Sequence, residues 1–351
     1  MTDRFPIAVL GAGAIGRMHA ERLLRHPSTA LAAIADPTPA GREFAQACGV
    51  PWFAEHGELL ATVRPAAAIV ATPNATHAEV GIACLRAGVA TLVEKPIADD
   101  PGAAARLCAE AENCGTPLLV GHQRRHNIAL QRARELVQGG AIGRPVTATV
   151  MANWLKPNAY FDLAWRRSAG GGPVLINLIH DIDMVRFLFG EVQAVQAMRS
   201  NAVRGFEVED SAVALLRMDS GMLVTLAVSD TTVSPWNWDL QAGEAAHYPQ
   251  QPEDAHFISG TEGALTLPHL RLWRYRGAHG WHESLSREET PLHRCDPYER
   301  QLQHLRDVAE GKVQPICSGA DGLRTLQATL AVLQAATSGR ITNPEEIACP
   351  A

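Results

Sequence analysis

The sequence predicts an α/β protein that begins with a doubly wound parallel sheet and continues with the antiparallel strands of a half-exposed sheet. Three features of the chain lead to this prediction. Short, wholly apolar runs alternate with helical segments through the first third, a glycine-rich turn follows the first run, and later strands alternate apolar with polar residues. Wholly apolar strands are typical of a parallel sheet covered on both faces, whereas alternating strands are typical of a sheet with one face in solvent.

The composition indicates a globular protein of about two domains, since the chain has 351 residues. It is 46% hydrophobic and 19% charged, which is enough apolar material for a core and excludes a disordered or fibrous chain. The net charge of −6 offers no basic excess for nucleic acid, and the longest apolar runs are too short to span a bilayer. We therefore expect neither a nucleic-acid partner nor a membrane.

The cysteine pattern predicts free thiols in a reducing compartment. The chain has seven cysteines, an odd number, and no two of them form a C-x-x-C pair. A chain of this length needs no disulfides for its stability, and the spacing suits no structural zinc site. The expected location is the cytoplasm, and no metal site is predicted.

Polar residues gather where each apolar run of the first third stops. Helical patterns such as Thr76–Ala87 and Pro101–Asn113 lie between the runs. Because the carboxyl ends of parallel strands meet at one edge, where ligands bind in such sheets, a crevice is expected along that edge. The predicted strands are Ile7–Leu10, Leu31–Ala35, Ala67–Ala71, Ala90–Val93 and Leu118–Val120.

The rest of the chain predicts a second domain with its own sheet, and we place the boundary between residues 124 and 125. Two helices are expected to close the chain, at Pro297–Glu310 and Asp321–Thr337. The alternating strands are predicted at Val146–Trp154, Val192–Ser200, Ser211–Met218 and Met222–Thr231.

The turn after the first strand is a candidate dinucleotide-binding loop of the form G-x-G-x-x-G. Gly11 permits the tight turn, Gly13 lets the backbone approach a pyrophosphate, and Gly16 lets the next helix pack close to the strand. The helix N-terminus adds N–H groups and a positive dipole. The expected phosphate-binding residues are Gly11, Gly13, Ala14, Ile15 and Gly16.

Asp36 ends the next strand, where a carboxylate can accept hydrogen bonds from the hydroxyls of the adenosine ribose. A carboxylate there would repel a ribose phosphate, so NAD is the favoured cofactor. Arg42 lies close enough in the sequence to leave NADP open.

Glu94-Lys95-Pro96 follows another buried strand and brings a lysine to the same edge. Burial or a neighbouring cation lowers the pKa of a lysine, so that it can exchange a proton with a substrate hydroxyl. The alternative is a lysine that extends from the strand end into solvent.

Gly170-Gly171-Gly172 opens an apolar helix that carries His180 and Asp183 on one face, three residues apart. His180 can finish a proton relay or donate to a developing alkoxide, and Asp183 can accept from a further hydroxyl. A histidine with a purely structural role is the alternative.

This ordered set of motifs, with Thr72-Pro73-Asn74-Ala75-Thr76-His77 between them, resembles the Gfo/Idh/MocA oxidoreductases along the whole chain. The resemblance implies an N-terminal Rossmann domain, residues 1–124, and a C-terminal α/β domain on an open, largely antiparallel sheet, residues 125–351. The second domain would bind substrate and form a homodimer or homotetramer through the outer face of its sheet. The implied activity is oxidation or reduction of a secondary alcohol of a sugar, cyclitol or cyclic diol.

The resemblance also implies roles for individual residues. Lys95 matches the catalytic lysine of the family and His180 its catalytic histidine. One position departs from the pattern, since the family commonly has an aspartate four residues before the histidine and this chain has Ile176. The residues that match the nicotinamide half of the cofactor cleft are Thr72, Pro73, Asn74, His77, Glu94, Lys95 and Gln123.

Substrate contacts are expected from polar and aromatic residues of the second domain together with an arginine after the last strand of the first. Aromatic faces suit the C–H side of a sugar or carbocycle, although such residues also serve cores and interfaces. Arg124, Arg166 and Arg167 are able to bind a substrate carboxylate. The candidate substrate-binding residues are Arg124, Asn153, Tyr160, Trp165, Asn177 and Asp183.

Three classes of function follow from these residues. The leading one is an NAD(P)-dependent dehydrogenase or reductase of carbohydrate metabolism, in which Lys95 and His180 handle the hydroxyl proton. The second is a redox-neutral enzyme that oxidises a sugar transiently to permit elimination or glycoside cleavage. The third is a non-catalytic NAD-binding regulator, which Ile176 favours and the retained Lys95 and His180 oppose.

Overall fold

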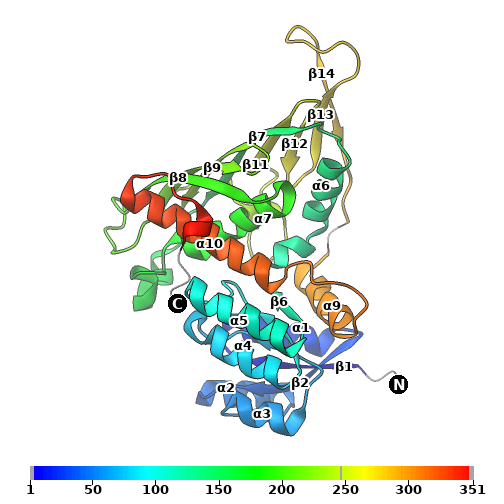
Figure 1. Cartoon of the computed structure of the whole chain (residues 1–351), viewed down its shortest axis with the longest axis vertical. Helices are drawn as coiled ribbons and strands as arrows, with labels where there is room; N and C mark the ends of the chain where they lie inside the picture. Colours follow the sequence, from blue (N-terminus) through cyan, green and yellow to red (C-terminus); the bar gives the residue numbers. More distant parts are fainter. Residues whose placement is uncertain (1–3, 246, 294, 348–351) are drawn as a thin grey trace. The chain divides into compact units, whose positions relative to one another are not determined.

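The computed structural model describes residues 4–245, 247–293 and 295–347. They form two compact units, shown in Figure 1. The first unit comprises residues 4–126 with 296–326, and the second comprises residues 127–295 with 327–347, within the described ranges. Among the described helices, none combines the length and the apolar character that crossing a bilayer requires.

The first unit is built on a six-stranded parallel sheet of order β3-β2-β1-β4-β5-β6. Its central strands are buried along their whole length, which confirms the doubly wound sheet that the apolar runs predicted. The strands are β1 (Phe5–Leu10), β2 (Thr29–Ala35), β3 (Trp52–Phe53), β4 (Ala67–Val70), β5 (Ala90–Val93) and β6 (Leu118–Val120).

Two helices of the first unit begin after residues whose side chains cap them. Thr38 and Asp100 each accept a hydrogen bond from a backbone N–H of the helix that follows, and a proline occupies the first turn in both. The helices of the N-terminal segment are α1 (Ala14–Arg25), α2 (Pro39–Cys48), α3 (His56–Val63), α4 (His77–Arg86) and α5 (Pro101–Cys114).

Helix α9 (Pro297–Ala309) also packs in the first unit, although the sequence placed it in the second domain. Its side chains Leu302, Leu305 and Val308 are buried in the hydrophobic cluster that includes Ile7 of β1. The sequence predicted a single boundary after residue 124, whereas the chain returns to the first unit with α9. It returns because the apolar face of α9 packs into the core of that unit.

The second unit is built on an eight-stranded sheet of order β14-β13-β12-β11-β7-β10-β9-β8. All neighbours are antiparallel except β7 and β10, so the predicted open, largely antiparallel sheet is confirmed. The four predicted strands are β7 (Pro145–Asn153), β8 (Val192–Ser200), β9 (Ser211–Met218) and β10 (Leu223–Ser229). Four further strands were not predicted: β11 (His256–Gly260), β12 (Ala264–Leu267), β13 (Arg271–Tyr275) and β14 (Leu285–Glu289).

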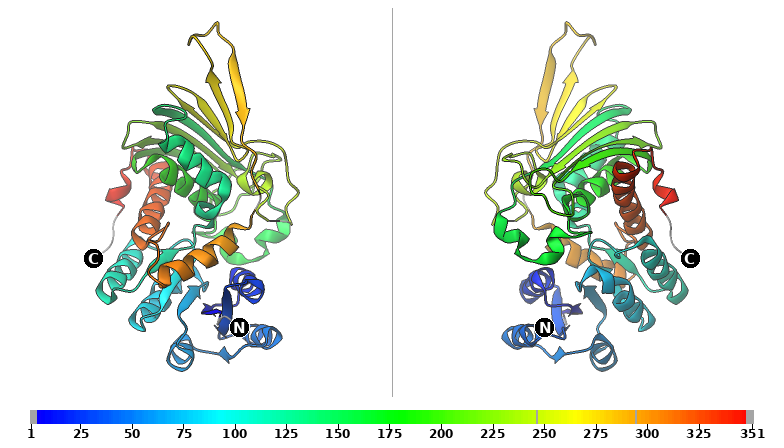
Figure 2. Two further views of the ribbon diagram at one scale, coloured as in Figure 1. Left: turned by 90° about the vertical axis from the view of Figure 1, so that its right-hand side faces the viewer. Right: turned by 90° about the vertical axis from the view of Figure 1, so that its left-hand side faces the viewer.

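Helices cover one face of this second sheet. Figure 2 shows α6 (Ile128–Gln138) and α7 (Ile179–Phe189) on the same side of it. Along β9, Ala212 and Ala214 are buried beneath the helices, whereas Val213 and Leu215 are more than half exposed on the opposite face. The alternation in the sequence therefore corresponds to one packed and one open face.

Truncation of Leu305 to alanine tests whether α9 is part of the core of the first unit. Leu305 is fully buried, so the lost contacts and the cavity are expected to lower the free energy of unfolding by about 3 kcal/mol. Urea unfolding followed by circular dichroism measures this change. The control is Glu299→Ala, an exposed position of the same helix, which should leave the midpoint almost unchanged. An equally small effect at Leu305 would contradict the packing of α9.

Candidate active site

The glycines of the first turn are required by close contacts of the backbone. Gly11 has a φ of 96°, and a Cβ there would lie 2.5 Å from the carbonyl oxygen of Ala71. A Cβ on Gly16 would lie 1.9 Å from the carbonyl oxygen of Gly11. In contrast, a Cβ on Gly13 would meet nothing within 4 Å. Gly11 and Gly16 therefore hold the turn against the sheet, while Gly13 leaves open space beside the start of α1.

The N-terminus of α1 has features of an anion-binding site. No side chain caps it, and its first turn contains no acidic residue. No acidic side chain of this turn therefore competes with a bound anion for the N–H groups of Ala14 and Ile15. Together with the open space at Gly13, this end fits the pyrophosphate of a dinucleotide.

Asp36 joins the glycine turn to the end of β2. Its Oδ2 accepts a hydrogen bond of 2.7 Å from the backbone N–H of Ala12, and its Oδ1 accepts from the backbone N–H and hydroxyl of Thr38. Burial raises the pKa of Asp36, but these hydrogen bonds lower it further than burial raises it, so the net pKa is below its ordinary value. The carboxylate is thus ionised, and its remaining lone pairs fit the ribose hydroxyls of the adenosine.

Arg42 is linked through Trp52 to the backbone of Asp36. Its guanidinium carbon stands 5.3 Å from the centre of the Trp52 ring, and the Trp52 indole N–H donates to the backbone oxygen of Asp36. Through this contact Arg42 belongs to the surroundings of Asp36, and NADP stays open as a cofactor.

His77 links the ends of two neighbouring strands. It is buried, with Nδ1 2.8 Å from the carbonyl oxygen of Pro96 and Nε2 2.8 Å from that of Thr72. Burial lowers its pKa more than these carbonyls raise it, so the ring is neutral and donates to one of them. Since Pro96 follows Lys95, His77 holds the segment that carries the lysine beside the turn that begins at Thr72 and continues through Pro73 and Asn74.

Glu94 is a buried structural partner of α1. It lies 2.7 Å from Nε2 of His19, and it also accepts from the backbone N–H of Lys95. Burial raises the pKa of Glu94, but the hydrogen bond with His19 and the nearby Lys95 lower it overall. The carboxylate before Lys95 is therefore ionised and held in place. Lys95 itself is half-buried at the end of β5, joined to Pro96 by a cis peptide bond.

Gln123 and Arg124 lie in a short 3-10 helix, Gln123–His126, after β6. Both side chains are buried. The carboxyl ends of β4, β5 and β6 thus bring Thr72, Lys95 and Gln123 to one edge of the sheet, as the strand pattern predicted.

In the second unit, the helix that carries His180 begins with a π-helical turn, Val174–Leu178, which runs directly into α7. π-turns are rare and are frequently found at functional sites. A Cβ on Gly172 would lie 2.2 Å from Oε1 of Glu209, and the same oxygen accepts from the backbone N–H of Val174. The glycine run is therefore a packing requirement that fixes where this helix starts.

Asn177 lies within the π-turn, three residues before His180, and is bonded to a lysine that the sequence analysis did not single out. Lys156 is buried, and its Nζ donates a hydrogen bond of 2.7 Å to Asn177 Oδ1. The same ammonium lies 3.7 Å from Asp230, which also pairs with Arg204 at 2.9 Å. A sequence signal existed, because the chain has three lysines and two of them, Lys95 and Lys156, precede a proline at the end of a strand.

The ring of Tyr160 contacts two cations. The Lys156 ammonium is 4.7 Å from the centre of its ring, and the Arg166 guanidinium carbon is 3.9 Å from it. Burial raises the pKa of Tyr160 more than Arg166 lowers it, so the phenol is neutral.

The other predicted substrate residues of the second unit lie in different surroundings. Asn153 is half-buried at the end of β7, and Trp165 is 51% exposed. Asp183 is almost fully buried on α7, where its neighbour Asp181 pairs with His256 at 3.0 Å.

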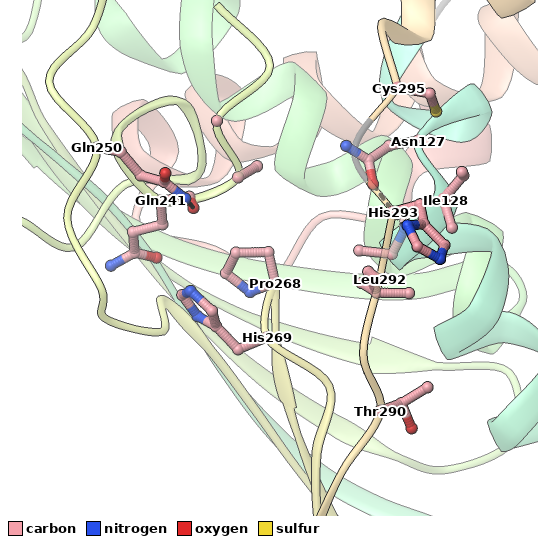
Figure 3. A pocket seen from close by; sticks show the side chains of 13 residues that line it. Asn127, Ile128, Gln241, Gln250, Pro268, His269, Thr290, Leu292, His293 and Cys295 are labelled. Atoms are coloured by element: carbon pink, nitrogen blue, oxygen red, sulfur yellow. Dashed lines mark hydrogen bonds between the residues drawn. The ribbon is translucent and has the colours of Figure 1, made fainter.

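A separate cavity of about 200 Å³ in the second unit is lined by none of the predicted site residues. Figure 3 shows Gln241, Gln250 and His269 on one side of it and Asn127 and His293 on the other. Gln241 Oε1 is buried and accepts no hydrogen bond from any residue in the described part of the chain. The cavity is polar, but it is distinct from the segments that carry Lys156, Asn177 and His180.

Each unit therefore brings together a different group of the predicted site residues. The first unit brings the glycine turn to Asp36, and Thr72, His77 and Lys95 to neighbouring strand ends. The second unit brings Tyr160 and Asn177 together around Lys156.

Comparisons with known proteins agree with these features. The family model "Oxidoreductase family, NAD-binding Rossmann fold" matches residues 5–122, and "GFO/IDH/MocA C-terminal domain" matches residues 130–266. A 1,5-anhydro-D-fructose reductase of Ensifer adhaerens is 29% identical over 80% of each chain. An inositol 2-dehydrogenase of Mycolicibacterium gilvum is 30% identical over 66% of each chain.

A solved structure shares the fold of the whole chain. It is an oxidoreductase from Agrobacterium radiobacter in complex with NAD+, L-tartaric acid and magnesium, with a TM-score of 0.82 and 20% identity. The match covers 99% of this chain and 100% of that one. The resemblance that the motifs indicated is confirmed: the chain is an NAD-binding oxidoreductase of the Gfo/Idh/MocA family.

Proposed function

We propose that the protein transfers a hydride between NAD and a secondary alcohol of a sugar, cyclitol or related cyclic diol. The observation that carries the proposal is the fixed position of Lys95. His77 holds the next residue, Pro96, and His19 holds the preceding residue, Glu94. Lys95 follows a strand of the sheet whose carboxyl edge also carries the glycine turn and Asp36. The names of the relatives, a reductase of an anhydro sugar and dehydrogenases of inositol, support this substrate class.

Lys95 and His180 are the proposed catalytic residues. Bound NAD supplies the carbon of the nicotinamide ring that accepts or donates the hydride. Lys95, in its neutral form, takes the proton of the substrate hydroxyl as the C–H hydride leaves, and returns it in the reverse direction. His180 hydrogen-bonds to the same oxygen and stabilises its negative character. The reaction is then balanced, since alcohol becomes ketone, one hydride passes to the cofactor and one proton to the lysine.

The remaining predicted residues are proposed to hold the two ligands. For the cofactor, these are the glycine turn, Asp36 and the residues at the strand ends. For the substrate, they are the polar and aromatic groups of both units. The cofactor set is Gly11, Gly13, Ala14, Ile15, Gly16, Asp36, Thr72, Pro73, Asn74, His77, Glu94, Lys95 and Gln123, and the substrate set is Arg124, Asn153, Tyr160, Trp165, Asn177 and Asp183.

The outer face of the second sheet is proposed to join copies of the chain into a homodimer or homotetramer. Cross-strand rows on this face place Met198 beside Val213, and Leu215 beside Thr225. Met198 is 73% exposed and Leu215 is 55% exposed, and the strands form a hollow of about 450 Å³. An apolar surface of this kind is typical of an interface between subunits.

Replacement of Lys95 by methionine tests the proton-transfer role. Turnover with the best sugar or cyclitol substrate is expected to fall by about 10²- to 10⁴-fold, because no other group of the proposed site replaces the lysine as base. Binding of NADH, measured by its fluorescence, should weaken far less than turnover falls, because the other residues of the cofactor set remain. Lys312→Met, at an exposed lysine, is the control and should keep full turnover. Unchanged turnover of the Lys95 variant would show that the mechanism is wrong.

Replacement of Asp36 by asparagine tests the choice of cofactor. Asparagine keeps an oxygen that accepts from Ala12, but it removes the charge that binds ribose hydroxyls and repels a ribose phosphate. We expect the KM for NAD to rise roughly tenfold and the preference over NADP to shrink. Because the pKa of Asp36 lies below its ordinary 3.8, the wild-type preference should be constant from about pH 5 to 9. A wild-type enzyme that uses NADP better would overturn the assignment.

Replacement of Leu215 by lysine tests the oligomer. The charge would lie in the middle of the apolar face, and light scattering at fixed concentration is expected to show a shift to a smaller species. Val233→Lys, at a loop residue that is 91% exposed, serves as the control for added charge. A wild-type protein that is a monomer at micromolar concentration would exclude this interface.

A further inference from the structure

Arg166 carries a charge that no carboxylate of the described chain neutralises by direct contact. Its Nη1 donates 2.6 Å to the backbone oxygen of Tyr160, and its guanidinium stacks on the Tyr160 and Trp165 rings. Its Nε is buried and has no hydrogen-bond partner among the residues described. The guanidinium is thus held by a carbonyl and two rings, so its position is set and its charge is available to an anion.

The orientation of the Asn177 amide is fixed by its partner. A lysine ammonium only donates hydrogen bonds, so Asn177 must turn its oxygen toward Lys156. Its Nδ2 is thereby directed away from Lys156, and no hydrogen bond from it to another described residue is present. The half-buried Asn177 therefore presents N–H donors about one helical turn before His180.

The turn that carries Arg166 is packed against the start of the helix that carries Asn177. The backbone N–H of Gly171 donates 2.9 Å to the carbonyl oxygen of Ser168. A Cβ on Gly171 would lie 2.3 Å from the carbonyl oxygen of Trp165 and 2.7 Å from Cα of Arg166. The side chains are linked as well, because the Arg166 guanidinium and the Lys156 ammonium contact the same Tyr160 ring, and that ammonium holds the Asn177 amide.

The acids around these groups are already engaged. Asp230 is shared between Arg204 and Lys156, and Asp210 accepts from the backbone N–H groups of Val203 and Arg204. Ile176 stands where the resemblance implies an aspartate, which removes a further negative charge from the turn. The amide N–H donors of Asn177 and the positive charge of Arg166 therefore favour a ligand group that is planar, negatively charged and able to accept hydrogen bonds.

We propose that Arg166 and the Asn177 amide form a carboxylate-binding subsite beside His180, and that the substrate is a sugar acid or another polyhydroxy carboxylate. The inference rests on the proposed function and narrows its substrate class. A guanidinium matches the two oxygens of a carboxylate, and the amide N–H supplies a further donor for the same group. Both residues determine specificity, whereas proton transfer remains with Lys95 and His180.

The test compares matched substrates that differ in one group. For each of several sugar acids, the acid, its primary amide, the neutral polyol and the phosphorylated polyol are assayed with NAD. We expect kcat/KM for the acid to exceed that for its amide by roughly tenfold or more. Arg166→Gln should remove this preference mainly through KM, and Arg340→Gln, at an exposed arginine of the same unit outside the proposed subsite, should retain it.

Substitutions at Asn177 give a second, independent measurement. Asn177→Asp places a negative charge beside the same Lys156 donor, so the KM for the acid should rise by a larger factor than the KM for the neutral polyol. Calorimetric binding of the acid to the enzyme with NADH reports the same change without turnover. Circular dichroism and thermal melting confirm that each variant is folded.

The outcomes separate the two proposals. If no compound is oxidised with either cofactor, the proposed function itself fails. If neutral polyols are oxidised as well as the acids, and Arg166→Gln changes neither, the dehydrogenase stands and the carboxylate subsite is excluded. A preference for phosphorylated polyols that depends on Arg166 would also overturn the carboxylate assignment.

Discussion

The close approach of the backbone at the first strand–helix turn is the constraint on which the cofactor half of the protein depends. Gly11 and Gly16 contact neighbouring backbone at distances that exclude any side chain, and Asp36 closes the turn through the N–H of Ala12. The same carboxylate thus holds the loop and is the group that we propose to bind the ribose. Its ionised state follows from the hydrogen bonds that build the turn, so the structure of the loop and its preference for a cofactor have one physical origin.

Around the reacting groups, buried hydrogen bonds fix backbone segments. His77 and His19 do not belong to the proposed proton relay, yet they hold the residues on either side of Lys95. In the second unit the glycine run and Glu209 fix the start of the helix that carries His180. The proposed catalytic residues therefore lie on segments whose positions are set by their neighbours, which is what precise hydride transfer requires.

The replacement of an acid by Ile176 changes the chemistry of a shared scaffold. The next residue, Asn177, has its oxygen occupied by Lys156, so the group directed away from that lysine is a donor. Arg166 adds a positive charge on the turn packed against the same helix. The family fold is kept, while the proposed subsite offers the substrate a hydrogen-bond donor and a positive charge.

The amino-acid sequence by itself determined the parallel sheet, the glycine turn with Asp36, the strand-end position of Lys95 and the family, because these depend on local patterns and ordered motifs. It left β11–β14 undetected, since those strands are only four or five residues long and glycine or proline lies in the connections between them. Only the tertiary structure decided that α9 returns to the first unit and that Lys156 orients Asn177. Both are contacts between residues far apart in the chain, and no local pattern of residues encodes which distant partner a buried side chain will meet.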